Sequence, residues 1–147
     1  MLKVVIDANV WISSLWSDGK PRRIRERFER GEFELFFAQE LLDECRDVLA
    51  RPKFDQWIDA NQAAVVLDLI RSRATFVRLP AAREAISRDP SDDKYLLCAK
   101  IGSCDFLVSG DPDLLVVGTH GGTRIVKPAE FLAILEQQGN ICESGQP

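Results

Sequence analysis

The chain has 147 residues, of which 46% are hydrophobic. This length is enough for one hydrophobic core and too short for two ordinary domains, so we expect a single domain. The formal net charge of −4 argues against nonspecific binding of nucleic acid by the whole surface, although a local basic patch could still guide a polyanion.

The cysteines and the start of the chain indicate a soluble, cytoplasmic protein. The four cysteines show no Cys-x-x-Cys spacing, and we expect reduced thiols that pack as small hydrophobic groups: Cys45, Cys98, Cys104 and Cys142. The opening residues MLKVVIDANVWI carry no cationic leader followed by a long apolar region. No segment reaches the roughly 18 uninterrupted apolar residues that a membrane span needs.

The first half of the chain alternates strand and helix patterns. The expected elements are a strand over 2–6, helices over 10–16 and 21–31, a strand over 33–38, and helices over 39–49 and 54–73. Asp7 follows the first strand, and Glu44 stands beside the apolar face of the 39–49 helix. In the 54–73 helix we expect these core residues: Trp57, Ile58, Val65, Val66, Leu69 and Ile70.

The second half continues the alternation. The expected elements are a strand over 75–79, a connector over 81–91, a helix over 95–101, strands over 105–109 and 123–126, and a helix from 128 to about 137. Asp92 is a plausible N-cap of the 95–101 helix. His120 falls in an expected glycine-rich loop and receives no role. We expect the domain to span residues 1–138, followed by a loose polar tail over 139–147.

Regular alternation of this kind predicts a three-layer α/β/α fold with a mostly parallel central sheet. Such open sheets bind ligands at the carboxyl ends of their strands. Asp7 and Asp111 each follow a strand, and Glu44 and Asp93 lie on helices that can reach the same edge. Gathered carboxylates repel one another, so this arrangement indicates a site for a hard divalent cation, Mg²⁺ or Mn²⁺.

Four motifs together carry a family resemblance. They are IDANVW at 6–11, ELLDECRDVLARPKF at 40–54, DPSDDKYLLCA at 89–99 and FLVSGDPDLL at 106–115. Over roughly residues 1–136 the chain resembles the PIN-domain ribonucleases. Its RPKF and DPSDDKYLL segments further resemble PIN proteins regarded as the toxin components of toxin–antitoxin systems in bacteria and archaea.

The resemblance implies a set of site residues. The catalytic and metal-binding acids would be Asp7, Glu44, Asp93 and Asp111, with Asn9 and Ser109 as their polar companions and Asp113 in a lesser supporting role. Ser109 stands where many members of the family have threonine. Asp93 is preferred as the third acid because its spacing to the apolar residues that follow fits an inward helical face. Asp89 and Asp92 remain the alternatives.

The function implied is that of a Mg²⁺-dependent endoribonuclease, a hydrolase that cleaves RNA phosphodiester bonds with a metal-activated water and needs no protein nucleophile. The same resemblance implies a toxin role, an antitoxin partner and a homodimer. A catalytically weak PIN-like domain that binds RNA or protein remains the main alternative. A dehalogenase-like phosphatase is disfavoured because Asn9 cannot act as its acid, and a receiver domain is disfavoured because Asp55 follows no apolar strand.

A stripe of arginines at helical spacing offers a second hypothesis. Arg23, Arg27 and Arg30 share one face of the 21–31 helix. Such a stripe is ordinarily a solvated face, but it could also contact the RNA backbone or an acidic partner. The tryptophans Trp11, Trp16 and Trp57 are expected to serve packing or dimer contacts.

Overall fold

The computed structural model describes residues 1–81 and 86–144, with side chains up to residue 138. Part of the expected connector, residues 82–85, and the last three residues of the expected tail lie outside the described residues, as does the side chain of Cys142. The division into a domain and a tail therefore stays a prediction.

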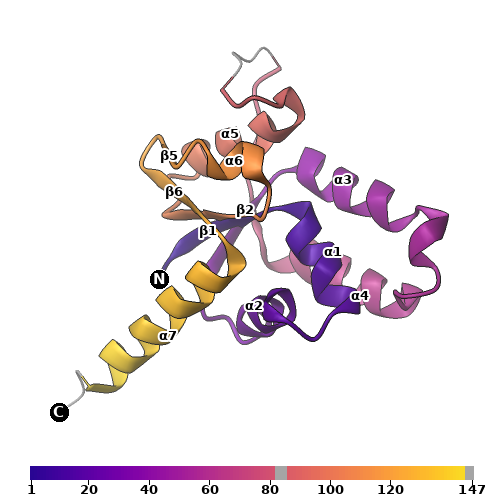
Figure 1. Cartoon of the computed structure of the whole chain (residues 1–147), viewed down its shortest axis with the longest axis horizontal. Helices are drawn as coiled ribbons and strands as arrows, with labels where there is room; N and C mark the ends of the chain where they lie inside the picture. The colour runs from indigo at the N-terminus through magenta and orange to yellow at the C-terminus, as the bar shows by residue number, and fades with distance from the viewer. Residues whose placement is uncertain (82–85, 145–147) are drawn as a thin grey trace.

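The centre of the fold is a mostly parallel six-stranded sheet (Figure 1). In spatial order its strands are β3 (Thr75–Phe76), β2 (Glu34–Phe37), β1 (Lys3–Ile6), β4 (Phe106–Val108), β6 (Thr123–Val126) and β5 (Thr119–His120). Only the pair β5 and β6 is antiparallel. The expected mostly parallel sheet is confirmed.

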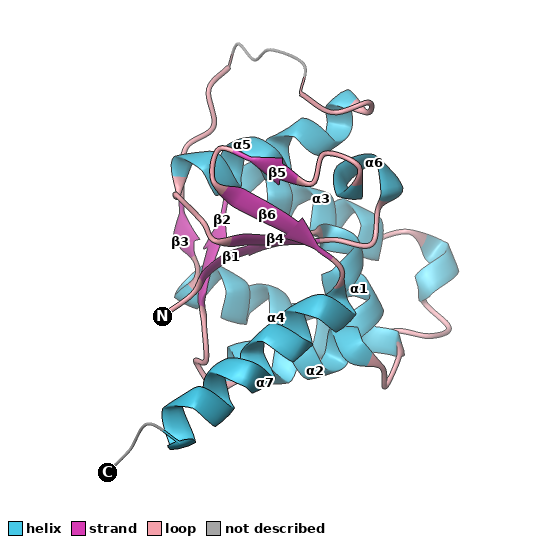
Figure 2. Cartoon of the chain, turned by 60° about the vertical axis from the view of Figure 1, so that its left-hand side comes forward, coloured by secondary structure: helices cyan, strands magenta, loops and turns pink. Residues whose placement is uncertain are grey.

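Helices cover both faces of this sheet. They are α1 (Ala8–Trp16), α2 (Lys20–Glu29), α3 (Gln39–Leu49), α4 (Ala60–Arg73), α5 (Asp93–Ile101), α6 (Pro112–Leu115) and α7 (Pro128–Ser144), with short 3₁₀ helices at Pro52–Phe54 and Pro90–Asp92. In both views α5 and α6 lie on one side of the sheet and α2 and α7 on the other (Figures 1 and 2). The expected three-layer α/β/α architecture is confirmed.

The strand order places a topological switch point between β1 and β4. From β1 the chain proceeds to β2, which pairs with one edge of β1. The later strand β4 pairs with the opposite edge of β1. β1 and β4 are parallel and in register, with Ile6 beside Val108. Asp7 and Ser109 therefore leave the sheet side by side at its carboxyl edge, where open α/β sheets bind ligands.

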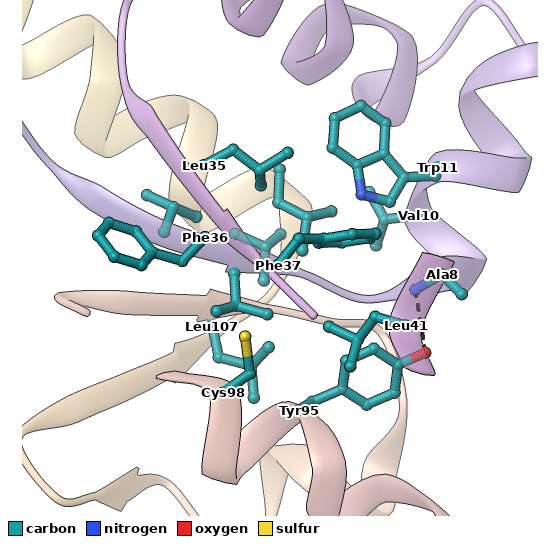
Figure 3. Close-up of a cluster of buried hydrophobic side chains, with 14 of the residues drawn as sticks. Ala8, Val10, Trp11, Leu35, Phe36, Phe37, Leu41, Tyr95, Cys98 and Leu107 are labelled. Atoms are coloured by element: carbon teal, nitrogen blue, oxygen red, sulfur yellow. Dashed lines mark hydrogen bonds between the residues drawn. The ribbon is translucent and has the colours of Figure 1, made fainter. Parts of the chain in front are cut away.

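The core forms around the two central strands. After Lys3, β1 consists of apolar β-branched residues, and Val4, Val5 and Ile6 are fully buried. Between the sheet and the helices pack Phe37, Leu107 and α5 residues such as Cys98 (Figure 3). The described cysteines are free and buried, and burial raises the pKa of the Cys98 and Cys104 thiols to about 12. These thiols act as core residues, as expected.

The predicted start of α4 was wrong. The helix begins at Ala60 rather than near Phe54, because the Asp59 carboxylate accepts hydrogen bonds from the backbone N–H groups of the first turn. The segment before it is a 3₁₀ helix and a turn, which leaves Trp57 exposed. Val65 lies on the outer face of α4 and is also exposed, so both were wrong as core predictions.

Other helix and strand boundaries also differ from those expected from the sequence, because tertiary contacts determine where these elements end. β3 is only two residues long, at the edge of the sheet. α6 and β5 were not expected, and His120 lies in β5 rather than in a loop. α7 continues to Ser144, past the expected end near residue 137. In the parts of the chain that the structure describes, every helix is too short or too polar to cross a membrane.

Candidate metal centre

Asp7 forms the floor of the site at the end of β1. It is 3% exposed and caps α1 by accepting a hydrogen bond from the Asn9 N–H at 2.9 Å. Burial raises the pKa of the Asp7 carboxyl, and the nearby carboxylates of Glu44 and Asp111 raise it further. Hydrogen bonds from Ser109 and Asn9 oppose that rise without cancelling it.

Ser109 connects the two acids that follow strands. Its hydroxyl donates to Asp7 Oδ2 at 2.6 Å and accepts the Asp111 N–H at 3.0 Å. Asp111 in turn caps α6 by accepting the Asp113 N–H at 2.9 Å. Since Ser109 is fully buried, this chain of hydrogen bonds fixes the two carboxylates relative to each other.

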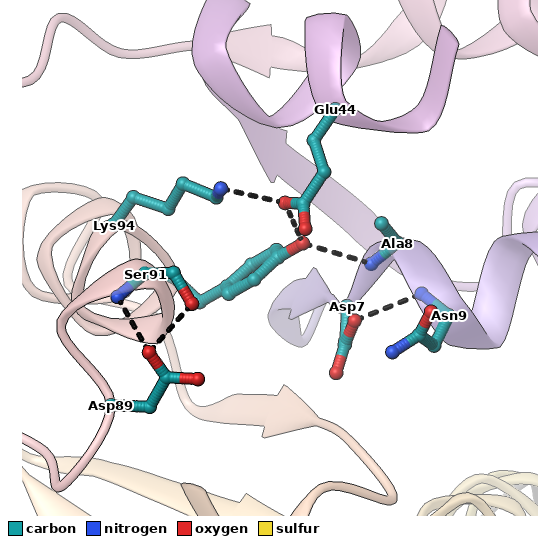
Figure 4. Close-up of polar contacts among 8 residues, drawn as sticks. Asp7, Ala8, Asn9, Glu44, Asp89, Ser91 and Lys94 are labelled. Carbon is teal, nitrogen blue, oxygen red and sulfur yellow. Dashed lines mark hydrogen bonds and ion pairs between the residues drawn. The ribbon is translucent and has the colours of Figure 1, made fainter. Parts of the chain in front are cut away.

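Glu44 reaches the site from α3. The buried Tyr95 hydroxyl donates to Glu44 Oε2 and accepts the Ala8 N–H at 3.3 Å, which ties α3 and α5 to the start of α1. Lys94 Nζ lies 2.8 Å from the same Glu44 oxygen. In Figure 4 Glu44 extends down from α3 and Lys94 extends from the left, so that their charged ends meet, and Asp7 lies below them.

Asp92 is the acid that α5 directs toward this group. It stands at the N-cap position of α5, as expected, but its side chain makes no capping hydrogen bond. Burial raises the pKa of the Asp92 carboxyl to about 7, together with a hydrogen bond to Asp111 and the charges of Asp111, Asp89 and Asp7. Asp92 Oδ2 is buried and has no hydrogen-bond partner in the described part of the protein.

Asp93 faces a different part of the structure. Its carboxylate accepts hydrogen bonds from the Ile86 N–H at 3.1 Å, the Ser87 N–H at 2.8 Å and the Ser87 hydroxyl at 2.7 Å. Burial alone would raise the pKa of Asp93, but these hydrogen bonds and the nearby His120 lower it. Asp93 therefore anchors the segment that leads into α5.

Asp89 and Asp113 extend the acidic group beyond Asp92. One oxygen from each of Asp89, Asp92 and Asp113 lies within 4.8 Å of the other two. Asp89 also caps the 3₁₀ helix through the N–H and hydroxyl of Ser91, which Figure 4 shows. Arg88 Nη2 lies 2.9 Å from Asp113 Oδ1 and partly balances the charge of the group.

The structure links several of the expected residues by hydrogen bonds or electrostatics, while the three oxygens within 4.8 Å of one another belong to Asp113 and to the alternatives Asp89 and Asp92. Asp7 and Asp111 are joined through Ser109, Asn9 supports Asp7 through its backbone N–H, and Glu44 acts electrostatically on Asp7. Asp113 lies beside Asp92. Of the expected acids, Asp93 is the one whose carboxylate is engaged elsewhere.

A helical pattern in the sequence could have favoured Asp92. Asp92 stands three, four and seven positions before Tyr95, Leu96 and Ala99, which are all buried. The same spacing identifies Tyr95 as a neighbour of the acid, a residue that sequence reasoning missed. Its bond to Glu44, 51 positions away, has no signal in the sequence.

Arg23 and Arg27 lie on α2 and Arg30 is its C-cap, so the arginine stripe is across the sheet from α5 and α6 (Figure 2). Arg27 pairs with Glu32 at 2.8 Å, and Arg30 lies 3.9 Å from the same side chain. Arg23 is exposed. Most of the stripe is therefore engaged in surface ion pairs, and its contact with RNA stays a prediction.

Two of the three tryptophans remain accessible. Trp11 packs in the core against Phe28. Trp16 and Trp57 pack against each other with ring centroids 5.8 Å apart, yet they are 48% and 55% exposed. A dimer contact at this pair stays a prediction.

The donor set fits a hard divalent cation. All candidate ligand atoms are carboxylate oxygens, which Mg²⁺ and Mn²⁺ prefer. Asp7 and Asp92 have raised pKa values because burial and neighbouring carboxylates disfavour their charged forms. A cation among these carboxylates would stabilise their charged forms, and the unpartnered Asp92 Oδ2 could serve as one of its ligands.

Comparisons with known proteins identify the family and support the fold. A family profile described as PIN domain matches residues 3–113. The fold is similar to the crystal structure of PAE2754 from Pyrobaculum aerophilum, with a TM-score of 0.60 and 15% identity, over 92% of this chain and 98% of that one. No curated protein matches the sequence.

Proposed function

We propose a function from one premise: the chain belongs to the PIN domain family, whose members are generally nucleases. The proposal is that this protein is an endoribonuclease that cleaves RNA phosphodiester bonds with the help of Mg²⁺ or Mn²⁺. The observation that supports it is a group of carboxylates at the carboxyl edge of the sheet: one oxygen from each of Asp89, Asp92 and Asp113 lies within 4.8 Å of the other two, and burial and neighbouring carboxylates raise the pKa of Asp7 and Asp92.

The acids that we propose as ligands are Asp7, Glu44, Asp92 and Asp111, with Asp113 in support. Asp92 takes the place that sequence reasoning gave to Asp93, because Asp92 faces Asp111 while Asp93 is saturated by hydrogen bonds from Ile86 and Ser87. What a bound Mg²⁺ or Mn²⁺ supplies in such a site is an activated water and stabilisation of charge on the phosphate.

The residues around the acids hold them in position. Ser109 fixes Asp7 against Asp111, and Tyr95 fixes Glu44 against the start of α1. Because these supporting hydroxyls are buried, the carboxylates keep their geometry before substrate arrives, which lowers the reorganisation needed for reaction. No side chain of the protein has to act as a nucleophile.

Further parts of the proposal rest on resemblance. The RPKF and DPSDDKYLL segments support a toxin role with an antitoxin partner in the cytoplasm. The exposed pair Trp16 and Trp57 is compatible with a homodimer contact. A short reading frame beside the gene would support the toxin role, and light scattering of the purified protein would test the dimer.

The proposal is tested with a mixed pool of single-stranded RNA. Purified wild type is compared with Asp7→Asn in Mg²⁺, Mn²⁺ or EDTA, and circular dichroism confirms that both proteins fold. We expect cleavage by the wild type in either metal, none in EDTA and none by the variant. Cleavage that persists in EDTA or in the Asp7→Asn variant would refute the metal mechanism. RNA binding without cleavage would favour the alternative, a catalytically weak PIN-like domain that binds RNA.

A further inference from the structure

We propose that Arg88 binds an RNA phosphate next to the scissile bond, and that a cation entering the acidic group releases it from Asp113 to do so. This inference rests on the proposed function. It assigns the substrate contact to a residue outside the metal ligands.

Arg88 stands at the rim of the acidic group. Its Nη2 lies 2.9 Å from Asp113 Oδ1 and donates to the Pro112 carbonyl at 3.4 Å, so the side chain spans from the segment before α5 to the start of α6. The side chain is nevertheless 62% exposed. A guanidinium in this place can exchange a carboxylate for a phosphate without leaving the site.

Asp113 is shared between Arg88 and the acidic group. Its carboxylate is one of three that lie within 4.8 Å of one another, with Asp89 and Asp92. The guanidinium and a divalent cation therefore compete for the same carboxylate, that of Asp113. Exposed ion pairs of this kind are weak, so a divalent cation can displace Arg88 at small cost.

Other cations near the site are less suited to this contact. Lys94 is held by Glu44, and its side chain is only 20% exposed. It lines a pocket of about 390 Å³ together with Arg51 and with four acidic residues of α3, so acids outnumber bases there: Glu40, Asp43, Glu44 and Asp47. A polyanion would be repelled there. Arg27 lies on α2 and Arg30 caps its C-terminal end, on the opposite side of the sheet from α6 (Figure 1).

If Arg88 and a divalent cation compete for Asp113, Arg88→Gln should change the affinities for Mn²⁺ and for RNA in opposite directions. Removal of the guanidinium frees Asp113, so the affinity for Mn²⁺ should rise about two- to fivefold. The affinity for RNA should fall about three- to tenfold, and the slope of log affinity against log salt should lose about 0.7, the value of one phosphate contact on a single strand. A merely structural role for Arg88 would instead weaken both kinds of binding.

The experiment measures the two affinities separately. Mn²⁺ binding is followed by calorimetry without RNA. RNA binding is followed by fluorescence anisotropy of a short labelled single strand in Ca²⁺, with gels to confirm that the RNA stays intact. Arg88→Lys keeps the charge and should retain most of the salt slope, which separates a phosphate contact from a change in folding.

Arg124→Gln is the matched control. Arg124 pairs with Glu130 at 3.4 Å and is 59% exposed, close to the exposure of Arg88, but it lies near the amino end of β6, away from the acids. It should change neither affinity. Unchanged RNA binding or weaker Mn²⁺ binding in Arg88→Gln would overturn the inference. If the wild type did not cleave RNA, that result would contradict the proposed function. It would not contradict the Arg88 inference, because the two binding assays do not depend on catalysis.

Discussion

Asp92 and Asp93 are adjacent in the chain, yet their carboxyl groups have opposite surroundings. Asp92 faces other carboxyl groups, and burial and those neighbours raise its pKa to about 7. Asp93 accepts three hydrogen bonds from Ile86 and Ser87, which outweigh its burial and lower its pKa. One residue is thus destabilised as an anion and the other is stabilised, which distinguishes the metal ligand that we propose from a structural anchor.

The first prediction concerns stability without metal. Asp92→Asn removes an unfavourable charge, so its melting temperature near pH 8 should exceed that of the wild type. Asp93→Asn removes a carboxylate that satisfies three donors, which should cost about 1–3 kcal/mol of unfolding free energy. Thermal and urea unfolding of the two variants measure the difference. A lower melting temperature for Asp92→Asn would contradict this assignment.

The same pair should differ in metal response. Mn²⁺ should raise the melting temperature of Asp93→Asn about as much as that of the wild type, because the ligands remain. Mn²⁺ should raise the melting temperature of Asp92→Asn little or not at all, because a proposed ligand is lost. If the two variants behave in the reverse way, Asp93 is the ligand after all.

Ser109 provides a test of the support for Asp7 and Asp111. Ser109→Ala removes the hydroxyl that bonds to both residues, so Mn²⁺ affinity should fall about 10–100-fold. Ser109→Thr keeps the hydroxyl and should retain much of that affinity, although its added methyl group in a fully buried position should cost about 1–3 kcal/mol of stability. Equal metal affinity in the two variants, measured by calorimetry, would argue against the role of the hydroxyl.

Tyr95 provides a test of the support for Glu44. Tyr95→Phe keeps the buried ring but leaves the Ala8 N–H without its partner and frees Glu44 on that side. We expect a loss of about 1–3 kcal/mol in unfolding free energy and weaker Mn²⁺ binding. Glu44→Gln should weaken Mn²⁺ binding as well, while the Tyr95 hydroxyl still has an acceptor. Full metal affinity in Tyr95→Phe would show that Glu44 needs no such support.

The pH dependence of metal binding follows from the raised pKa of Asp92. A carboxyl whose folded pKa is raised lowers stability once pH exceeds its unfolded value near 4, and that cost is complete above about pH 7. A bound cation requires the deprotonated form. The apparent Mn²⁺ affinity should therefore rise between about pH 5 and pH 7 and level off above it. A flat profile by calorimetry would contradict a protonated Asp92 in the metal-free protein.

The sequence predicted the elements whose patterns are local. β1, β4 and β6 are short apolar runs with clear ends, and α3 lies between a buried strand and Pro52. The start of α4 was missed because apolar Trp57 and Ile58 extend the helical pattern into a turn. Asp59 decides that boundary through its capping hydrogen bonds.

The sequence alone does not distinguish neighbouring acids at the site, because they differ only in tertiary contacts. Asp7 and Asp111 follow parallel strands, so the topology alone brings them together. Asp92 and Asp93 compete at the start of one helix, and the hydrogen bonds of Ser87 to Asp93 separate them. No periodicity predicts such a contact between a connecting segment and a helix.

The position of Mn²⁺ in crystals tests the central claim most directly, since anomalous scattering locates the ion without reference to activity. We expect Mn²⁺ at roughly 2–2.5 Å from oxygens of Asp92 and Asp111, beside Asp7, with Asp93 still bonded to Ser87. Mn²⁺ bound by Asp93, or no ordered Mn²⁺ near Asp7 at saturating concentration, would contradict it.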